Sequence, residues 1–205
     1  ARLETATRST MRRARSRDLG RELQTTLSSS VALDGVGVHS GKPARILLHP
    51  ADANTGLVFL RSDLAAEPVA PALWSRVVST ELCTTIGLDG RHAVATVEHA
   101  LAALAGLGVD NALIEVDGPE IPVLDGSAAP FVAAIDEAGV ATQAAGRRAI
   151  EILKAVRVER GNAFAELSPA DGDGLTLDVE IDFDHAAIGR QRRALRLDPA
   201  TFRRE

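Results

Sequence analysis

Glu98 and His99 stand next to each other at the start of an apolar run that extends to Leu107. Apolar residues recur in this run at helical spacing, which predicts a buried helix of about three turns. A carboxylate and an imidazole are costly in such surroundings unless each has a partner. In a structural interpretation, Glu98 is a first-turn helix charge and His99 hydrogen-bonds a nearby carbonyl. In a chemical interpretation, His99 is a metal ligand and Glu98 is the base that acts on water at the metal.

The spacing of the histidines does not complete a metal site. A catalytic zinc needs three protein ligands, usually histidines together with a carboxylate. None of the five histidines begins an H-x-x-x-H or H-x-x-x-D pair. The chain also contains no H-E-x-x-H, C-x-x-C, Walker or G-x-S-x-G motif. Taken alone, these residues offer at most part of a metal site.

The composition indicates a globular protein with a sizeable core. The 205 residues are 45% hydrophobic and 25% charged, with a formal net charge of −5. The single cysteine, Cys83, excludes a disulfide framework and a cysteine-built zinc site, and such usage fits a reducing compartment. The sequence shows neither an apolar run long enough to span a bilayer nor a signal peptide. We therefore expect a soluble, cytoplasmic monomer without a transmembrane segment.

Residues 1–23 form a basic tail, with seven arginines among the first 22 positions and no apolar periodicity. Such a tail is most often a solvated, disordered extension. It could also bind nucleic acid or an anionic lipid surface. A non-catalytic α+β module that binds nucleic acid through this tail is therefore one alternative for the whole chain.

The elements that must position Glu98 and His99 are short strands and two helices in residues 24–142. The Asp89-Gly90 pair is a strong hairpin signal, and this hairpin leads directly to the Glu98-His99 helix. A second helix follows Ser127, which is placed to cap it, and Gly139 should end it. The predicted strands cover residues 27–33, 44–49, 57–60, 84–88, 91–95 and 112–116.

The remaining residues predict a second group of strands that is followed by a helix. A small, polar stretch at 141–148 indicates a linker, and strands are predicted at 150–157, 164–167, 175–183 and 194–197 as a meander. Asp198-Pro199 then begins a helix of only two turns. The predicted fold class is α+β, with a two-layer α/β sandwich domain at 24–142 and an incomplete second similar domain at 146–205.

Seven motifs occur in the same order as in one known family. They are GVGVHSGK at 35–42, NTG at 54–56, LCTT at 82–85, TVEH at 96–99, ALAGLGVDN at 103–111, PEIPVLDGSA at 119–128 and IDFDH at 181–185. From about Gln24 to Glu205 the chain resembles the UDP-3-O-acyl-N-acetylglucosamine deacetylase family. These are zinc enzymes of the first committed step of lipid A synthesis in Gram-negative bacteria. The resemblance implies two similar α+β sandwiches with the active site at their interface, a UDP-linked acylated sugar as substrate, and no nucleic acid.

The resemblance also implies roles for four residues at the reaction centre. His99 matches the first zinc ligand and Glu98 matches the general base. His39 matches a histidine near the metal, where a second, inhibitory zinc can bind. Asp125 matches an acidic residue whose role is either orienting or structural, and as a turn or capping residue it would need no catalytic role.

Four further residues match positions that contact substrate in the family. Leu82 and Cys83 match the wall close to the catalytic centre, and Cys83 is better explained as a small buried hydrophobe than as a reactive thiol. Asp182 and Phe183 match the place where the uracil ring is held. Without the resemblance, Phe183 reads simply as the last inward residue of its strand.

The departures from the family pattern limit what this chain can do. The other two zinc ligands of the family come from a later helix bearing H-K-x-x-D, and its general-acid histidine follows that helix; this sequence contains neither. Ala163 also stands where relatives carry a lysine. We therefore expect the chain to be inactive as it stands. A nucleotide-sugar binding relative that has lost catalysis is a further alternative.

Overall fold

The computed structural model describes residues 23–170 and 174–204, and within these ranges it is a mixed α+β protein. This confirms the predicted class. The predicted basic tail lies outside the described residues except for Leu23. No helix among the described residues is both long and apolar enough to cross a membrane.

A five-stranded sheet forms one layer of the first part of the chain. Its order is β2-β3-β9-β4-β5, and every neighbouring pair is antiparallel except β4 and β9. Along β3, Ile46 and Leu48 are fully buried while their neighbours are more exposed, as the predicted alternation requires. The strands are β2 (Val31–Val36), β3 (Pro43–Pro50), β4 (Leu57–Arg61), β5 (Val69–Pro71) and β9 (Ala112–Val116).

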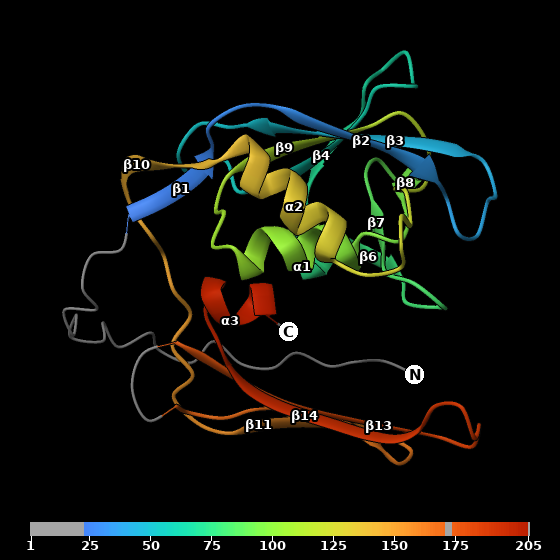
Figure 1. The fold of residues 1–205 in the computed structure, drawn as a ribbon, viewed down its shortest axis with the longest axis vertical. Helices are drawn as coiled ribbons and strands as arrows, with labels where there is room; N and C mark the ends of the chain where they lie inside the picture. Colours follow the sequence, from blue (N-terminus) through green and yellow to red (C-terminus); the bar gives the residue numbers. More distant parts are fainter. Residues whose placement is uncertain (1–22, 171–173, 205) are drawn as a thin grey trace.

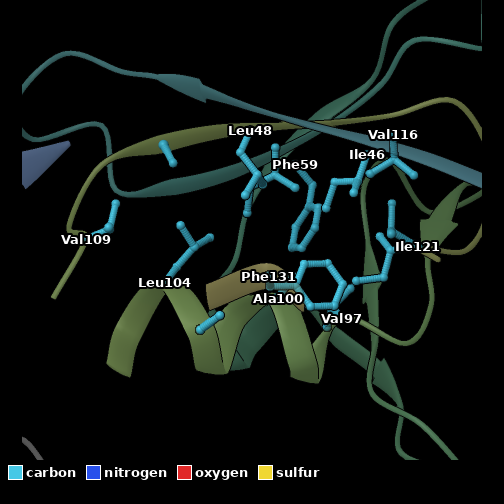
Figure 2. Packing of buried hydrophobic residues seen from close by; sticks show 14 of the residues in the cluster. Ile46, Leu48, Phe59, Val97, Ala100, Leu104, Val109, Val116, Ile121 and Phe131 are labelled. Carbon is cyan, nitrogen blue, oxygen red and sulfur yellow. The ribbon is translucent and has the colours of Figure 1, made fainter. Parts of the chain in front are cut away.

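Two helices, α1 (Glu98–Gly106) and α2 (Ala129–Ala138), cover one face of this sheet (Figure 1). Phe131 of α2 and Phe59 of β4 meet in the middle of the core, and Leu104 of α1 lies beside them (Figure 2). The second helix ends at Gly139, whose φ of 72° suits glycine, as predicted. Helix α1 therefore presents its first turn, with Glu98 and His99, at one end of the core.

A small three-stranded sheet leads into α1. It consists of β6 (Val77–Ser79), β7 (Thr85–Gly87) and β8 (Ala93–Val94), and a 3₁₀ turn, η1 (Trp74–Arg76), precedes it. The predicted hairpin is confirmed between β7 and β8, with Gly90 at φ 83°. Arg61 ties this sheet to the larger one, because its buried guanidinium donates to Asp63 at 2.6 Å and to the Ala93 carbonyl at 2.9 Å.

Strands β1 (Leu23–Leu27) and β10 (Val140–Gly146) pair with each other and correct two predictions. The linker predicted at 141–148 is wrong for most of its length, because residues up to 146 form β10. The single strand predicted at 27–33 is divided by a bend at 28–30 into the end of β1 and the start of β2. Small polar residues are compatible with an edge strand when their amides find partners.

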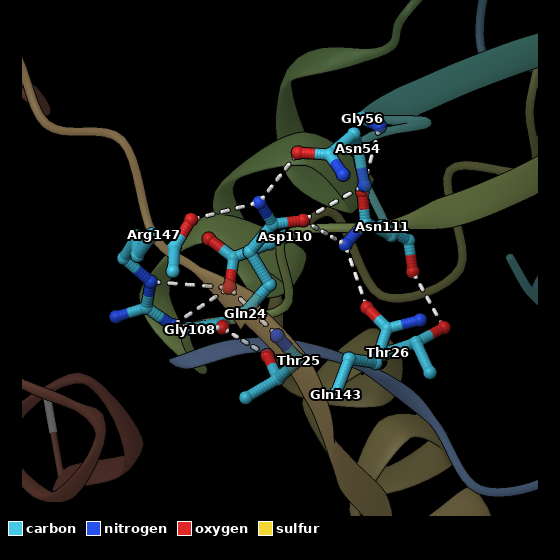
Figure 3. Close-up of polar contacts among 11 residues, drawn as sticks. Gln24, Thr25, Thr26, Asn54, Gly56, Gly108, Asp110, Asn111, Gln143 and Arg147 are labelled. Carbon is cyan, nitrogen blue, oxygen red and sulfur yellow. Dashed lines mark hydrogen bonds and ion pairs between the residues drawn. The ribbon is translucent and has the colours of Figure 1, made fainter. Parts of the chain in front are cut away.

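Carboxamide side chains link these two strands to Asn111 (Figure 3). Asn111 is 1% exposed and donates to Gln24 at 2.9 Å and to Gln143 at 2.7 Å. Its own oxygen accepts the N–H of Gly56 at 2.8 Å. Arg147 extends the network with an ion pair to Asp110. The network fastens β1 and β10 to the segment that joins α1 to β9.

The last part of the chain contains two separate hairpins and a short helix. The predicted meander is therefore present only as pairs, β11 with β12 and β13 with β14, and residues 150–155 are not in a strand. Asp198 caps the final helix by accepting the Thr201 N–H at 2.7 Å, as predicted. The elements are β11 (Val156–Arg160), β12 (Ala163–Leu167), β13 (Leu175–Phe183), β14 (Gly189–Leu197) and α3 (Pro199–Arg204). Helix α3 lies next to α1 (Figure 1). Its Phe202 packs against the core.

Candidate active site

The first turn of α1 is held by the main chain of Thr84. The Thr84 N–H donates to Glu98 Oε2 at 2.9 Å, and the Thr84 carbonyl accepts the Val97 N–H at 3.3 Å. No side chain caps this helix, so the carboxylate of Glu98 is the first-turn anion that the helix N-terminus favours. These contacts place the segment that carries Leu82 and Cys83 beside Glu98.

His99 has a ring nitrogen that lacks a hydrogen-bond partner. Its Nδ1 atom is buried, and no protein group among the described residues bonds to it. Buried polar atoms in proteins are nearly always paired, so an orphaned imidazole nitrogen indicates a missing partner. A metal ion satisfies such a nitrogen, because neutral imidazole is a common metal ligand.

The described residues supply only part of a metal site. No group of three or more His, Cys, Asp and Glu side chains in residues 23–170 and 174–204 is arranged to hold a metal ion. His99 therefore fits as one ligand of a metal site that needs further ligands.

Asp125 lies in a tight turn close to His99. Its Oδ1 accepts both the hydroxyl and the N–H of Ser127, at 2.8 and 2.9 Å. The hydrogen bonds from the Ser127 hydroxyl and the Ser127 N–H lower the pKa of Asp125 below its ordinary value. Ser127 in turn accepts the Ala129 N–H, although the N-cap itself is Ala128. The contacts of Asp125 thus support a turn role.

His39 lies in the exposed loop between β2 and β3, and a buried glutamate holds this loop. The His39 N–H donates to Glu120 Oε1 at 3.0 Å, and the Ser40 N–H donates to Oε2 at 2.9 Å. The Thr96 hydroxyl donates to the same carboxylate at 3.1 Å. Glu120 thereby joins the His39 loop to the residue that lies two positions before Glu98.

Sequence reasoning missed Glu120, although a signal was present. Glu120 follows Pro119 within an otherwise apolar stretch that runs on through Ile121 to Leu124. A carboxylate in such a stretch is buried at a cost unless it has several donors. Its donors come from segments far away in the sequence, and sequence spacing does not reveal them.

Strained backbone accompanies the predicted site residues. Leu82, Thr96 and Leu124 adopt φ values of 63°, 61° and 54°, a region that non-glycine residues rarely occupy. Each lies within two residues of Cys83, Glu98 or Asp125. Such strain concentrates at functional sites in proteins.

Asp182 and Phe183 lie apart from this group of contacts. Phe183 pairs with Gly189 at the tip of the β13–β14 hairpin, opposite the end that leads to α3, and its side chain is 54% exposed. The structure therefore brings the segments of His39, Leu82, Cys83, Glu98, His99 and Asp125 together around the start of α1. It does not join Asp182 and Phe183, the two residues predicted to hold the uracil ring, to them.

A cavity of about 360 Å³ opens beside the small sheet, but it contains none of the predicted site residues. Its lining includes two arginines whose charges would suit an anion more than an acyl chain. The lining residues are Ser75, Arg76, Val78, Gly87, Gly90, Arg91, His92 and Ala93.

Comparisons with known proteins agree with the motifs. The sequence model of the LpxC family, described as UDP-3-O-acyl N-acetylglycosamine deacetylase, matches residues 24–205. The chain is 49% identical over 182 residues to proteins from Brucella ovis, Brucella canis and Brucella melitensis that are named UDP-3-O-acyl-N-acetylglucosamine deacetylase. The match covers 89% of this chain and 63% of each relative.

Proposed function

Because this chain belongs to the LpxC family, we propose that it forms part of a zinc-dependent deacetylase. The proposed reaction removes the acetyl group from UDP-3-O-acyl-N-acetylglucosamine, which is the committed step of lipid A biosynthesis. The chain spans 63% of the length of the relatives named above, so the proposal concerns the complete protein to which this chain belongs. The proposed location is the cytoplasm, and the proposed assembly is a monomer.

The observation that carries the proposal is that Glu98 and His99 stand next to each other at the start of α1. His99 offers a buried nitrogen without a partner, and Glu98 is held beside it by the Thr84 N–H. A purely structural role would need a hydrogen-bond partner for the buried Nδ1 of His99, and none is present among the described protein groups. The arrangement therefore favours the chemical interpretation of both residues.

In the proposed site, zinc would be held by His99 together with ligands outside the described residues. When bound, zinc supplies Lewis-acid chemistry, which lowers the pKa of a water molecule and polarises an amide carbonyl. Glu98 takes the proton of the attacking water at a carboxylate oxygen. The Thr84 N–H holds Oε2, so Oε1 remains for this proton transfer.

The other predicted residues have supporting roles in the proposal. Asp125 orients the imidazole of His99 through its nearby negative charge. His39 lines the centre from the β2–β3 loop, and Leu82 with Cys83 forms a wall beside Glu98. Asp182 and Phe183 hold the uracil ring, with the exposed ring of Phe183 available for stacking.

The test is acetate release from UDP-3-O-acyl-N-acetylglucosamine by the complete purified protein. Removal of metal with a chelator should abolish the release, and added zinc should restore it. UDP-N-acetylglucosamine without the acyl chain serves as the matched substrate control and should react more slowly. Acetate release that persists without metal would contradict the proposed mechanism.

A further inference from the structure

Glu120 is a buried carboxylate whose partners are all neutral. Its residue is 4% exposed, and it accepts hydrogen bonds from the N–H groups of His39 and Ser40 and from the hydroxyls of Ser40 and Thr96. No salt bridge to Glu120 occurs among the described residues. A carboxylate stabilised in this way depends on the position of each donor.

The loop that carries His39 closes around this carboxylate. Gly37 donates to the Lys42 carbonyl and accepts from Gly41, both at 2.9 Å, which makes the loop a compact turn. A Cβ at Gly37 would overlap with Glu120 Oε2 and Ser40 Oγ. Glycine at position 37 therefore allows the loop to approach the carboxylate closely.

On its other side, the Glu120 segment runs along the residues that precede α1. The Ala95 N–H donates to the Pro119 carbonyl at 2.9 Å, and the Ile121 N–H donates to the Ala95 carbonyl at 3.3 Å. Thr96 is β-branched and has a φ of 61°, so its backbone is strained. The bond from its hydroxyl to Glu120 holds it in that conformation.

We propose that Glu120 is a positioning residue that fixes the His39 loop against the Thr96 turn, and so sets where His39 stands relative to Glu98 and His99. Its carboxylate is the only group seen to bond to both segments among the described residues. The catalytic consequence rests on the proposed function, whereas the fixation of the loop does not.

The first experiment measures amide hydrogen exchange of the 205-residue chain by NMR. Glu120→Gln keeps one acceptor oxygen but places an NH₂ group where the second oxygen accepted, so it cannot hold both loop amides. We expect the His39 and Ser40 amides to exchange about tenfold faster or more, since each loses a charge-assisted hydrogen bond. The Ile114 amide in the core should not change. Unchanged exchange at both His39 and Ser40 would overturn the proposal.

Two controls separate fixation of the loop from general loss of stability. Glu115→Gln removes another carboxylate, which lies in β9 and pairs with His49 at 3.0 Å, and it should leave the loop amides protected. If Glu120→Gln does not fold, two variants of Thr96 test the proposal instead. Thr96→Val should increase exchange in the His39 loop, and Thr96→Ser should restore protection because it keeps the hydroxyl. Equal exchange in both Thr96 variants would then overturn the proposal.

The second experiment measures deacetylation by the complete protein. Glu120→Gln should lower kcat about tenfold or more and change KM little, because it displaces His39 from the reaction centre without removing a substrate contact. In a His39→Ala background the same substitution should change kcat less than twofold, since its effect passes through His39. Fully additive losses would show that Glu120 does not act through His39. If the wild-type protein releases no acetate, the proposed function fails, and the exchange result alone decides the fixation of the loop.

Discussion

The aromatic ring of Phe202 in α3 lies directly against Gly106, the last residue of α1. A Cβ at position 106 would overlap with the ring atoms. Arg203 reinforces the contact from the same helix through an ion pair with Asp136 of α2. The final helix is therefore seated on the helical layer of the first part of the chain by one close aromatic contact and one ion pair.

This contact predicts that the effect of Gly106→Ala changes sign with the residue at position 202. Alanine is up to about 1 kcal/mol better than glycine in a helix, yet overpacking against a ring costs about 1–3 kcal/mol. Gly106→Ala should therefore destabilise the wild-type chain, as measured by urea unfolding. In a Phe202→Ala background it should stabilise. The same sign in both backgrounds would show that the ring does not pack on Gly106.

The pairing of β1 with β10 predicts where the first part of the chain can be cut. We propose that residues 24–142 carry an independently folding unit, and the structure shows contacts that continue beyond residue 142. Gln143 bonds to Asn111, Gly146 pairs with Leu23, and Arg147 pairs with Asp110. A fragment of residues 23–148 should therefore unfold at a higher urea concentration than one of residues 23–142. Equal midpoints would mean that these contacts add nothing to stability.

The pair of Arg61 and Asp63 predicts a loss of stability in acid. The hydrogen bonds from the Arg61 guanidinium lower the pKa of Asp63 below its ordinary value of about 3.9. A lowered folded-state pKa means that this stabilisation is complete above about pH 4 and is lost as the pH falls through the folded pKa. Asp63→Asn should cost about 1–3 kcal/mol at pH 7 and progressively less below pH 4. The matched control is Asp34→Asn, whose exposed pair with Arg45 is worth little at any pH.

Much of the fold follows from local patterns in the sequence. The helical spacing after Glu98, the Asp89-Gly90 turn, the Gly139 stop and the Asp198 cap all predict the elements that the structure contains. Each of these signals depends on residues within a few positions of one another, which is why spacing alone reveals them.

The features that sequence patterns missed depend on distant partners. The sequence predicts a linker in place of β10 because the small polar residues there show no apolar alternation, and the partner strand β1 lies more than 100 residues away. The role of Glu120 was missed for the same reason, since its donors belong to residues 39, 40 and 96. Glu98 and His99 indicate the candidate site from sequence alone because two adjacent polar residues at the start of an apolar helix form a local pattern.

The proposed mechanism predicts that Glu98 and His99 fail in different ways when they are replaced in the complete protein. Glutamine at position 98 can still accept the Thr84 N–H through its amide oxygen, so the first turn of α1 should keep its shape. It cannot take a proton from water, and general-base catalysis typically contributes about 10²- to 10⁴-fold. Glu98→Gln should therefore lower kcat by that order with little change in KM and full zinc content. The measurements are steady-state kinetics and metal analysis of the same samples.

His99→Gln should instead release zinc, because it removes an imidazole whose Nδ1 has no other partner among the described protein groups. Metal analysis after dialysis should find the zinc content reduced, and added zinc should restore part of the activity. Glu115→Gln, which removes a carboxylate bound to His49, should match the wild-type protein in both measurements.

Near-normal kcat in Glu98→Gln at saturating zinc would leave Glu98 as a first-turn helix charge only. The proton would then have to pass to another base. The proposed role of the Thr84 N–H in leaving Oε1 free for proton transfer would also be wrong.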